Sequence, residues 1–177
     1  MAEIKPTDVA KLRSITGAGM QTCKQALVDA DGNMDTAVDI LRKQGAATAA
    51  TKALKEAREG VIANFIQPGG KLGVVVELNC QTDFVARNED FRKFCDEVAQ
   101  AIAGDPNVDL EARRLEMVSK MGENIVIARN QRMEVSGNGA AAAYIHTGAK
   151  VGVLVEVGCD KQETTATPEF KQIVKDI

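Results

Sequence analysis

The pattern of hydrophobic and polar positions changes near residue 60 from the period of a helix to that of a strand. Before that point, three short segments between residues 7 and 45 place apolar residues three or four positions apart, and a glycine follows each segment. Glycine is the residue that most often ends a helix, so the third segment is expected to close at Gly45. We therefore predict a three-helix domain over residues 1–45 and an alanine-rich helical linker over 46–60.

After residue 60 the chain alternates between strand-like and helix-like segments. Residues 60–66 and 71–80 are rich in Val, Ile and Leu and flank the turn sequence QPGG, which predicts an antiparallel hairpin. Helical spacing returns over 89–104 and 109–122, and an apolar strand is predicted within 123–135. Helices and strands in separate runs are typical of the α+β class.

The strand-rich part of the chain contains an internal repeat. The segment FIQPGGKLGVVVELNC at 65–80 aligns without a gap on YIHTGAKVGVLVEVGC at 144–159, a constant offset of 79 residues (144 − 65 = 79). The identical positions in the first copy are Ile66, Gly69, Lys71, Gly73, Val74, Val76, Glu77 and Cys80. A duplicated hairpin-plus-helix unit is the simplest explanation. We predict a first core subdomain over 61–135, with an intervening helix, and a second over 136–177 that repeats 61–98 incompletely.

Two pairs of charged residues recur in both copies. Glu77 and Glu156 lie inside predicted strands, and Lys71 and Lys150 precede them by six residues. We interpret the glutamates as structural and predict that they pair with these lysines in the facing half of the sheet.

Phe84 stands outside the hydrophobic pattern, in the polar stretch NCQTDFVARNEDF. The repeat tests its role, because a position that both copies need for packing should be apolar in both. Phe91 aligns with Phe170, whereas Phe84 aligns with Glu163. Since burying an unpaired carboxylate is costly, Phe84 is predicted to be an exposed aromatic anchor for a partner. Packing under its own loop is the alternative.

Composition and charge narrow the function classes. The net charge is −3, 45% of the 177 residues are hydrophobic, and only 3% are aromatic, with no Trp. Acidic and basic residues are interspersed, so the chain has little electrostatic attraction for nucleic acid, and direct nucleic-acid binding is not expected. No apolar run is long enough to cross a membrane, and the N-terminus has no signal-like segment, so we expect a cytoplasmic protein.

No residue pattern indicates catalysis or a cofactor. The cysteines Cys23, Cys80, Cys95 and Cys159 are widely separated and are expected to be buried small hydrophobic residues in a reducing compartment. A single histidine, His146, excludes a two-histidine metal site, and the glycine-rich stretches lack the phosphate-binding arrangements. We predict no catalytic, metal-binding or cofactor-binding residues and no enzymatic activity.

Four segments carry a resemblance to a known family. LRSITGAGMQTCKQAL (12–27), LRKQGAATAATKA (41–53), VELNCQTDFVARNEDF (76–91) and MGENIVIARN (121–130) closely resemble the elongation factor Ts family. The similarity covers nearly the whole chain in order. It implies a ubiquitin-associated-like three-helix N-terminal domain and a core of two related subdomains. It also implies a function, the exchange of guanine nucleotide on the GTPase elongation factor Tu.

The resemblance also implies which residues contact the partner. Its Thr-Asp-Phe-Val signature corresponds to Thr82, Asp83, Phe84 and Val85, which would dislocate Mg²⁺ from elongation factor Tu. The further implied partner contacts are Arg13, Met20, Lys24, Met121, Gly122 and His146. A core position is the alternative for Met20, and an ordinary surface position is the alternative for His146.

Other functions and the extent of the chain stay open at this stage. A generic protein-binding module, or a non-exchanging paralogue that uses the three-helix domain, would also fit the sequence, and homodimerisation is undecided. The sequence stops seven residues after Phe170, before the second copy is complete. We therefore expect a truncated member of the family that exchanges nucleotide less efficiently than a longer form.

Overall fold

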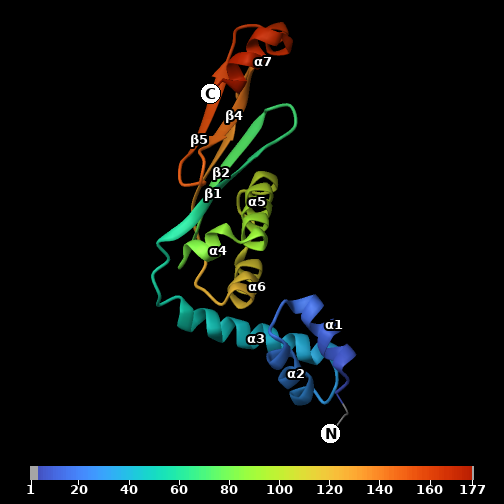
Figure 1. Cartoon of the computed structure of the whole chain (residues 1–177). Helices are drawn as coiled ribbons and strands as arrows, with labels where there is room; N and C mark the ends of the chain where they lie inside the picture. The colour runs from blue at the N-terminus through green and yellow to red at the C-terminus, as the bar shows by residue number, and fades with distance from the viewer. Residues whose placement is uncertain (1–3, 177) are drawn as a thin grey trace. The chain divides into compact units, whose positions relative to one another are not determined.

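The computed structural model describes residues 4–176, which form helices and two antiparallel sheets (Figure 1). In chain order the elements are α1 (Pro6–Thr16), α2 (Met20–Asp29), α3 (Met34–Lys52), β1 (Glu59–Ile66), β2 (Leu72–Cys80), α4 (Asp83–Arg87), α5 (Glu89–Gly104), α6 (Glu111–Met121), β3 (Val126–Glu134), β4 (Gly139–Ile145), β5 (Gly152–Gly158), the 3-10 helix η1 (Gln162–Ala166) and α7 (Pro168–Lys175). The predicted α+β class is confirmed. The first three residues of the predicted N-terminal domain, and Ile177 of the predicted last helix, lie outside the described residues.

The chain divides into two compact units, which are described separately. The first contains residues 4–56 and 111–125, and the second contains residues 57–110 and 126–176. In the first unit, α1, α2 and α3 pack around one apolar cluster. Its fully buried members are Leu12, Cys23, Ala26, Leu27 and Ala37. The three helices predicted within residues 7–45 are therefore confirmed, apart from the end of the third.

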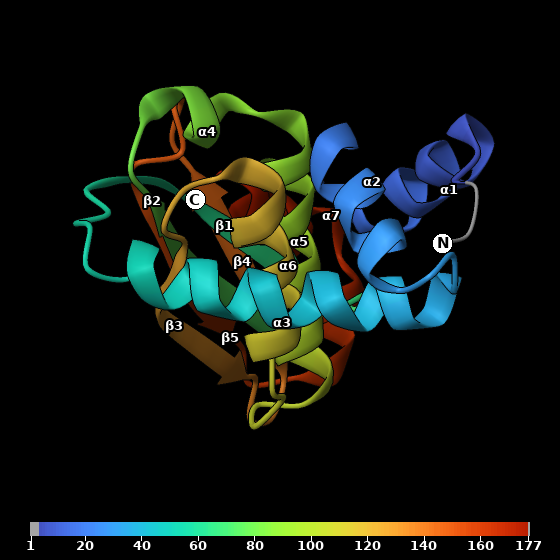
Figure 2. The same ribbon diagram turned by 90° about the horizontal axis from the view of Figure 1, so that it is seen from below.

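That third helix does not end at Gly45, so this prediction was wrong. α3 continues to Lys52, and the rest of the predicted helical linker is not helical. Gly45 is buried and faces α6, where a Cβ would lie 3.6 Å from the Ser119 hydroxyl (Figure 2). The alanines that follow favour a helix, and Ala49 is buried as well. Helix propensity and packing against α6 together outweigh the cost of one interior glycine.

Two side chains tie the end of α6 to the end of α3. Lys52 Nζ donates a hydrogen bond of 2.5 Å to Gly122 O. Asn124, which is 5% exposed, donates through Nδ2 to Lys55 O at 2.8 Å. Because a buried amide without a partner is costly, this contact holds together residues that are far apart in the sequence.

In the second unit, β1, β2 and β3 form an antiparallel sheet in that order, and α5 packs on β1 and β2 (Figure 1). Alternate residues of β2 face this helix, as the burial of Val74, Val76 and Leu78 indicates. Phe91 and Val98 of α5 complete the buried layer. The predicted hairpin, the helix over 89–104 and the strand within 123–135 are all confirmed.

The second copy repeats the fold of the first at the predicted offset. β4 and β5 form a hairpin like that of β1 and β2. η1 begins 79 residues after α4 (162 − 83 = 79), and α7 begins 79 residues after α5 (168 − 89 = 79). Within residues 4–176, the β4–β5 sheet has no third strand equivalent to β3. The internal duplication predicted from the sequence is thus confirmed by the order and spacing of the elements.

The two copies are joined by a pair of equivalent hydrogen bonds. Ile62 N donates to Ala149 O, and Ala141 N donates to Gly70 O, both at 2.7 Å. These bonds exchange when 79 is added to or subtracted from each residue number (141 − 62 = 79; 149 − 70 = 79). The hairpins are therefore related by a local pseudo-twofold axis. Gly152 permits the close approach, since a Cβ there would lie 2.6 Å from Ile62 Cγ2.

The predicted pairing of the repeated glutamates with the repeated lysines was wrong. Glu77 Oε2 instead accepts a hydrogen bond of 2.5 Å from Arg129 Nε of β3, its partner in the β2–β3 register. Lys71 donates to Gly137 O at 2.8 Å, and Lys150 forms an ion pair with Glu59. The sequence could not show this, because the neighbour across a strand depends on which strand pairs with β2.

The Glu77–Arg129 contact predicts a pH-dependent contribution to stability. The hydrogen bond from Arg129 lowers the pKa of the Glu77 carboxyl below its usual 4.5. A lowered folded-state pKa stabilises the protein above the unfolded-state value, and the effect is lost as pH falls through the folded-state value. Because Arg129 is largely exposed, Glu77→Gln should lower the unfolding free energy at neutral pH by less than about 1 kcal/mol.

Urea unfolding of both proteins at neutral pH and at about pH 3 measures this difference, which should shrink at the lower pH. Glu156→Gln is the matched control, since Glu156 occupies the same place in the second copy and is exposed. An equal loss in both variants, or a loss that does not change with pH, would contradict the assignment.

Candidate functional site

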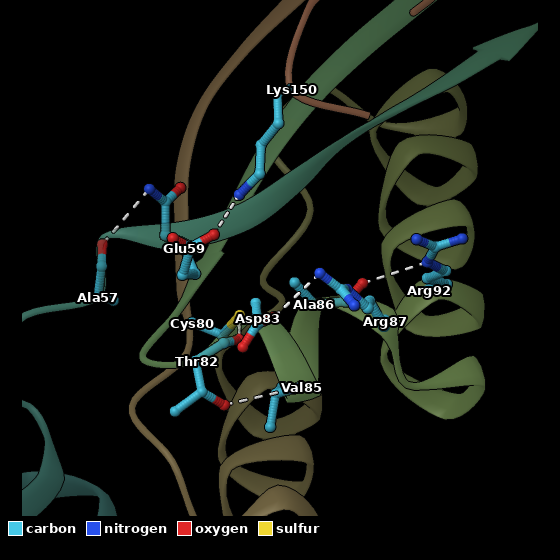
Figure 3. A network of polar contacts seen from close by, with 11 residues as sticks. Ala57, Glu59, Cys80, Thr82, Asp83, Val85, Ala86, Arg87, Arg92 and Lys150 are labelled. Carbon is cyan, nitrogen blue, oxygen red and sulfur yellow. Dashed lines mark hydrogen bonds and ion pairs between the residues drawn. The ribbon is translucent and has the colours of Figure 1, made fainter. Parts of the chain in front are cut away.

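The candidate site begins where β2 ends, at the buried residue Cys80. The Cys80 thiol donates a hydrogen bond of 3.2 Å to Thr82 O, which fixes the turn out of the sheet (Figure 3). Thr82 then caps α4, because its Oγ1 accepts from Val85 N at 3.3 Å. A threonine before the first helical residue commonly provides this cap. The Thr-Asp-Phe-Val segment is therefore the start of a short helix rather than a loop.

α4 has a buried side and an exposed side. Val85 is 9% exposed and Ala86 5% exposed, so these two residues hold the helix against the unit. Phe84 precedes them by one position and is 82% exposed. A helix turns about 100° per residue, so a helix anchored through Val85 and Ala86 can direct Phe84 into solvent. The prediction that Phe84 is exposed rather than part of the core is confirmed.

Charged side chains hold both ends of this helix. Arg87 Nη2 lies 3.0 Å from Asp83 Oδ2, one turn away on α4. Arg92, from the first turns of α5, donates through Nε to Ala86 O at 3.2 Å (Figure 3). Asn88 separates the two helices, and its Oδ1 accepts from Asp90 N and Phe91 N to cap α5. α4 is therefore fixed by polar contacts along its length as well as by burial.

The second copy keeps the turn but not the aromatic residue. Cys159 donates to Lys161 O at 3.3 Å, as Cys80 does to Thr82 O. This shared contact explains why both copies have a cysteine at this position. The segment that follows is a 3-10 helix whose first residue has no side-chain cap, and Glu163 takes the exposed position of Phe84. The capped α-helix and its phenylalanine are thus specific to the first copy.

The other predicted contact residues lie on four different elements. Arg13, Met20 and Lys24 are exposed on α1 and α2, and Met20 and Lys24 lie one turn apart. Met121 is half-buried at the end of α6, and exposed Gly122 follows it with a φ of +73°. These five residues all belong to the first unit.

His146 belongs to the second unit with Thr82–Val85, and it lies in the exposed turn between β4 and β5. Its Nδ1 is 2.9 Å from the Tyr144 hydroxyl. Lys150 in the same turn pairs with Glu59, which is opposite Cys80 in the β1–β2 register (Figure 3). The turn and α4 therefore adjoin the same end of that strand pair.

Sequence reasoning missed the residues that support α4. The Asp83–Arg87 spacing of four and an asparagine before a helical segment are recognisable signals for an ion pair and a cap. They were not used. The Arg92 contact has no sequence signal, because it depends on how α5 folds back beside α4.

The structure offers no arrangement for metal or acid–base chemistry in the part of the chain that it describes. No group of three or more His, Cys, Asp or Glu side chains within residues 4–176 is placed to hold a metal ion. Burial raises the pKa of the Cys95 thiol, so this group stays protonated and is a poor nucleophile. In the same residues, every helix is too short or too polar to span a bilayer.

Comparison with known proteins identifies close relatives. The family model for elongation factor TS matches residues 81–177, which include the whole candidate site. Elongation factor Ts of Symbiobacterium thermophilum is 44% identical over 100% of this chain and 60% of its own length. The elongation factors Ts of Nostoc punctiforme and Trichlorobacter lovleyi are both 40% identical, over 99% and 98% of this chain and 61% of their own length. The chain thus spans about 60% of the length of these relatives.

Proposed function

Because this chain belongs to the elongation factor Ts family, we propose that it is a translation elongation factor that promotes the release of GDP from elongation factor Tu. In this role it acts in the cytoplasm as a guanine-nucleotide exchange factor. It binds the GTPase, weakens the binding of GDP, and is displaced when GTP binds. It requires no cofactor of its own and performs no covalent chemistry.

One observation carries this proposal, the exposed Phe84 ring on an anchored helix. The ring is 82% exposed, although a phenylalanine side chain is stabilised by leaving water. Large aromatic side chains held on a rigid element are typical hot spots of protein interfaces. The equivalent position of the second copy is a glutamate, so folding of the unit does not explain the ring. Recognition of a partner does.

In the proposed mechanism, Phe84 inserts between helices of elongation factor Tu near its Mg²⁺ ion. Asp83 assists this insertion. Displacing a helix beside the Mg²⁺–diphosphate cluster removes positive charge from the phosphates, which lowers the affinity for GDP. By linkage, a factor that binds the empty GTPase more tightly than the GDP form weakens GDP binding by the same factor. No bond needs to be broken.

Several contacts must contribute, since one such linkage typically supplies about 1–3 kcal/mol. Thr82 supports Phe84 by capping α4, and buried Val85 anchors the same helix. The additional contacts that we propose lie on both units: Arg13, Met20, Lys24, Met121, Gly122 and His146. The first three present a mixed apolar and basic surface that suits a protein partner.

Release of a fluorescent GDP analogue from elongation factor Tu tests this proposal directly. Addition of the chain should raise the first-order release rate, and the rate should saturate with concentration as a complex forms. An excess of unlabelled GTP prevents rebinding of the analogue. A release rate that stays at the spontaneous value at every concentration of the chain would refute exchange activity.

A second candidate function is protein binding without exchange, through the three-helix bundle. The observation in its favour is a row of exposed residues on α2, where Met20 and Val28 are 45% and 43% exposed and Lys24 lies between them. A ubiquitin-associated-like bundle would use such a face to bind a folded partner. In that case the chain would bind elongation factor Tu, or another protein, and substitution of Phe84 would have no effect.

A further inference from the structure

The two copies differ in the helical turn that follows their hairpins, although their other elements correspond. Residues 83–87 form an α-helix in the first copy, and residues 162–166, at the same places in the second copy, form a 3-10 helix. Three side-chain contacts are specific to the first copy. They are the Thr82 cap, the Asp83–Arg87 ion pair and the Arg92 hydrogen bond to Ala86 O.

The Arg92 contact is the one that reaches α4 from outside. The Thr82 and Asp83 contacts lie within the turn itself, whereas Arg92 belongs to α5 and bonds a carbonyl in the last turn of α4. A cation at that end of a helix satisfies a carbonyl that has no partner within the helix and interacts favourably with the helix dipole. The aligned residue of the second copy is Lys171 (171 − 92 = 79). In the described part of that copy, Lys171 donates no hydrogen bond to Thr165 O, the equivalent carbonyl.

We infer that Arg92 is a positioning residue for Phe84: by holding α4 helical against α5, it fixes the direction in which the exposed ring projects. This inference rests on the proposed function, because it concerns the residue that would enter elongation factor Tu. An isolated helix of five residues is unstable, so contacts outside α4 must maintain it. The ring itself contributes little, since at 82% exposure it makes few contacts with its own unit.

The benefit of this arrangement appears on binding. A side chain that is already fixed in its bound direction loses less conformational freedom when it enters a partner. Arg92 would then raise the efficiency of exchange without touching elongation factor Tu. Val85 and Ala86 keep the helix attached to the unit, and Arg92 sets its orientation.

A single tryptophan provides a direct test of the helix without any partner. The chain contains no Trp, so Phe84→Trp places one reporter at the exposed position. Fluorescence anisotropy of this protein should fall when Arg92→Ala is added, because the helix and the ring become more mobile. Lys171→Ala, at the aligned position of the second copy, is the matched control and should leave the anisotropy unchanged. Thermal unfolding of each protein verifies that the unit is still folded.

A double-mutant cycle in the GDP-release assay tests the functional part. Arg92→Ala alone should lower the maximal release rate about fivefold, the effect of losing one charge-assisted hydrogen bond, with a smaller change in the half-saturating concentration. In the Phe84→Ala background, Arg92→Ala should change the rate by less than twofold, since no ring remains to be positioned. Arg92→Lys, which keeps one charged donor, should restore part of the rate.

The outcomes separate this inference from the proposed function. Unchanged anisotropy in the tryptophan protein, or an equal loss of rate from Arg92→Ala with and without the Phe84 ring, overturns the positioning role alone. A chain without substitutions that does not accelerate release at all overturns the proposed function and the positioning role with it. A fall in anisotropy together with a loss of rate that requires the ring supports both.

Discussion

Phe84→Ala is expected to remove most of the acceleration of GDP release from elongation factor Tu while leaving the chain folded. The ring is 82% exposed, so its removal takes almost no buried surface from the unit. Aromatic hot spots at interfaces typically cost about 2–4 kcal/mol when they are truncated, which corresponds to a rate loss of roughly 30-fold or more. The release rate at a saturating concentration of the chain measures this effect.

Glu163→Ala is the matched control for this substitution. Glu163 is exposed and lies at the position of Phe84 in the second copy, so its removal should leave the release rate unchanged. Phe84→Leu should be intermediate, because it keeps an apolar side chain but not the flat ring. Wild-type release by the alanine variant would eliminate the proposed wedge, and binding without exchange through α1 and α2 would become the better explanation.

Gly60→Ala is expected to destabilise the second unit by about 3 kcal/mol or more, the largest effect on folding that we expect from removing no side chain. Gly60 lies in β1 with a φ of +150°, in a region that only glycine adopts readily. A Cβ there would lie 2.1 Å from Leu78 O of the paired strand β2. Neither backbone can move away without breaking the ladder, so the hairpin that carries α4 would be disturbed. Urea unfolding followed by circular dichroism measures the loss.

Gly104→Ala provides the contrast. Gly104 is the last residue of α5, and a Cβ there meets no atom within 4 Å, so alanine should be neutral or slightly stabilising. Gly139→Ala should act like Gly60→Ala, because its Cβ would lie 2.4 Å from Val157 O in the equivalent hairpin. Similar stability of the Gly60 and Gly104 variants would show that β1 can shift away from β2 at low cost.

The hydrophobic pattern was sufficient for most of the elements. Alternation and β-branched composition predicted the β1–β2 hairpin, and helical spacing predicted α5, because both signals are local. The repeat added information that single elements lack. Comparing Phe84 with Glu163 separated an exposed functional position from a packing position, and the structure confirmed its exposure.

Local signals failed where a distant segment changed their meaning. Gly45 is a normal helix-ending residue, but α6 packs against it and α3 continues. Glu77 has a lysine nearby in the sequence, but the β2–β3 register gives it Arg129 instead. The support of α4 by Arg92 likewise requires two helices to meet at a defined angle. None of these neighbours can be identified from spacing along the chain.

The amino-acid sequence by itself therefore determined the elements, the duplication and the residue that stands apart from the core, because backbone propensity and burial act on each residue and its near neighbours. Only the tertiary structure decided which strand lies beside β2, how the two hairpins join through reciprocal hydrogen bonds, and what holds Phe84 outward. Those features depend on the free energy of contacts between residues far apart in the chain, and such contacts exist only once the chain has folded.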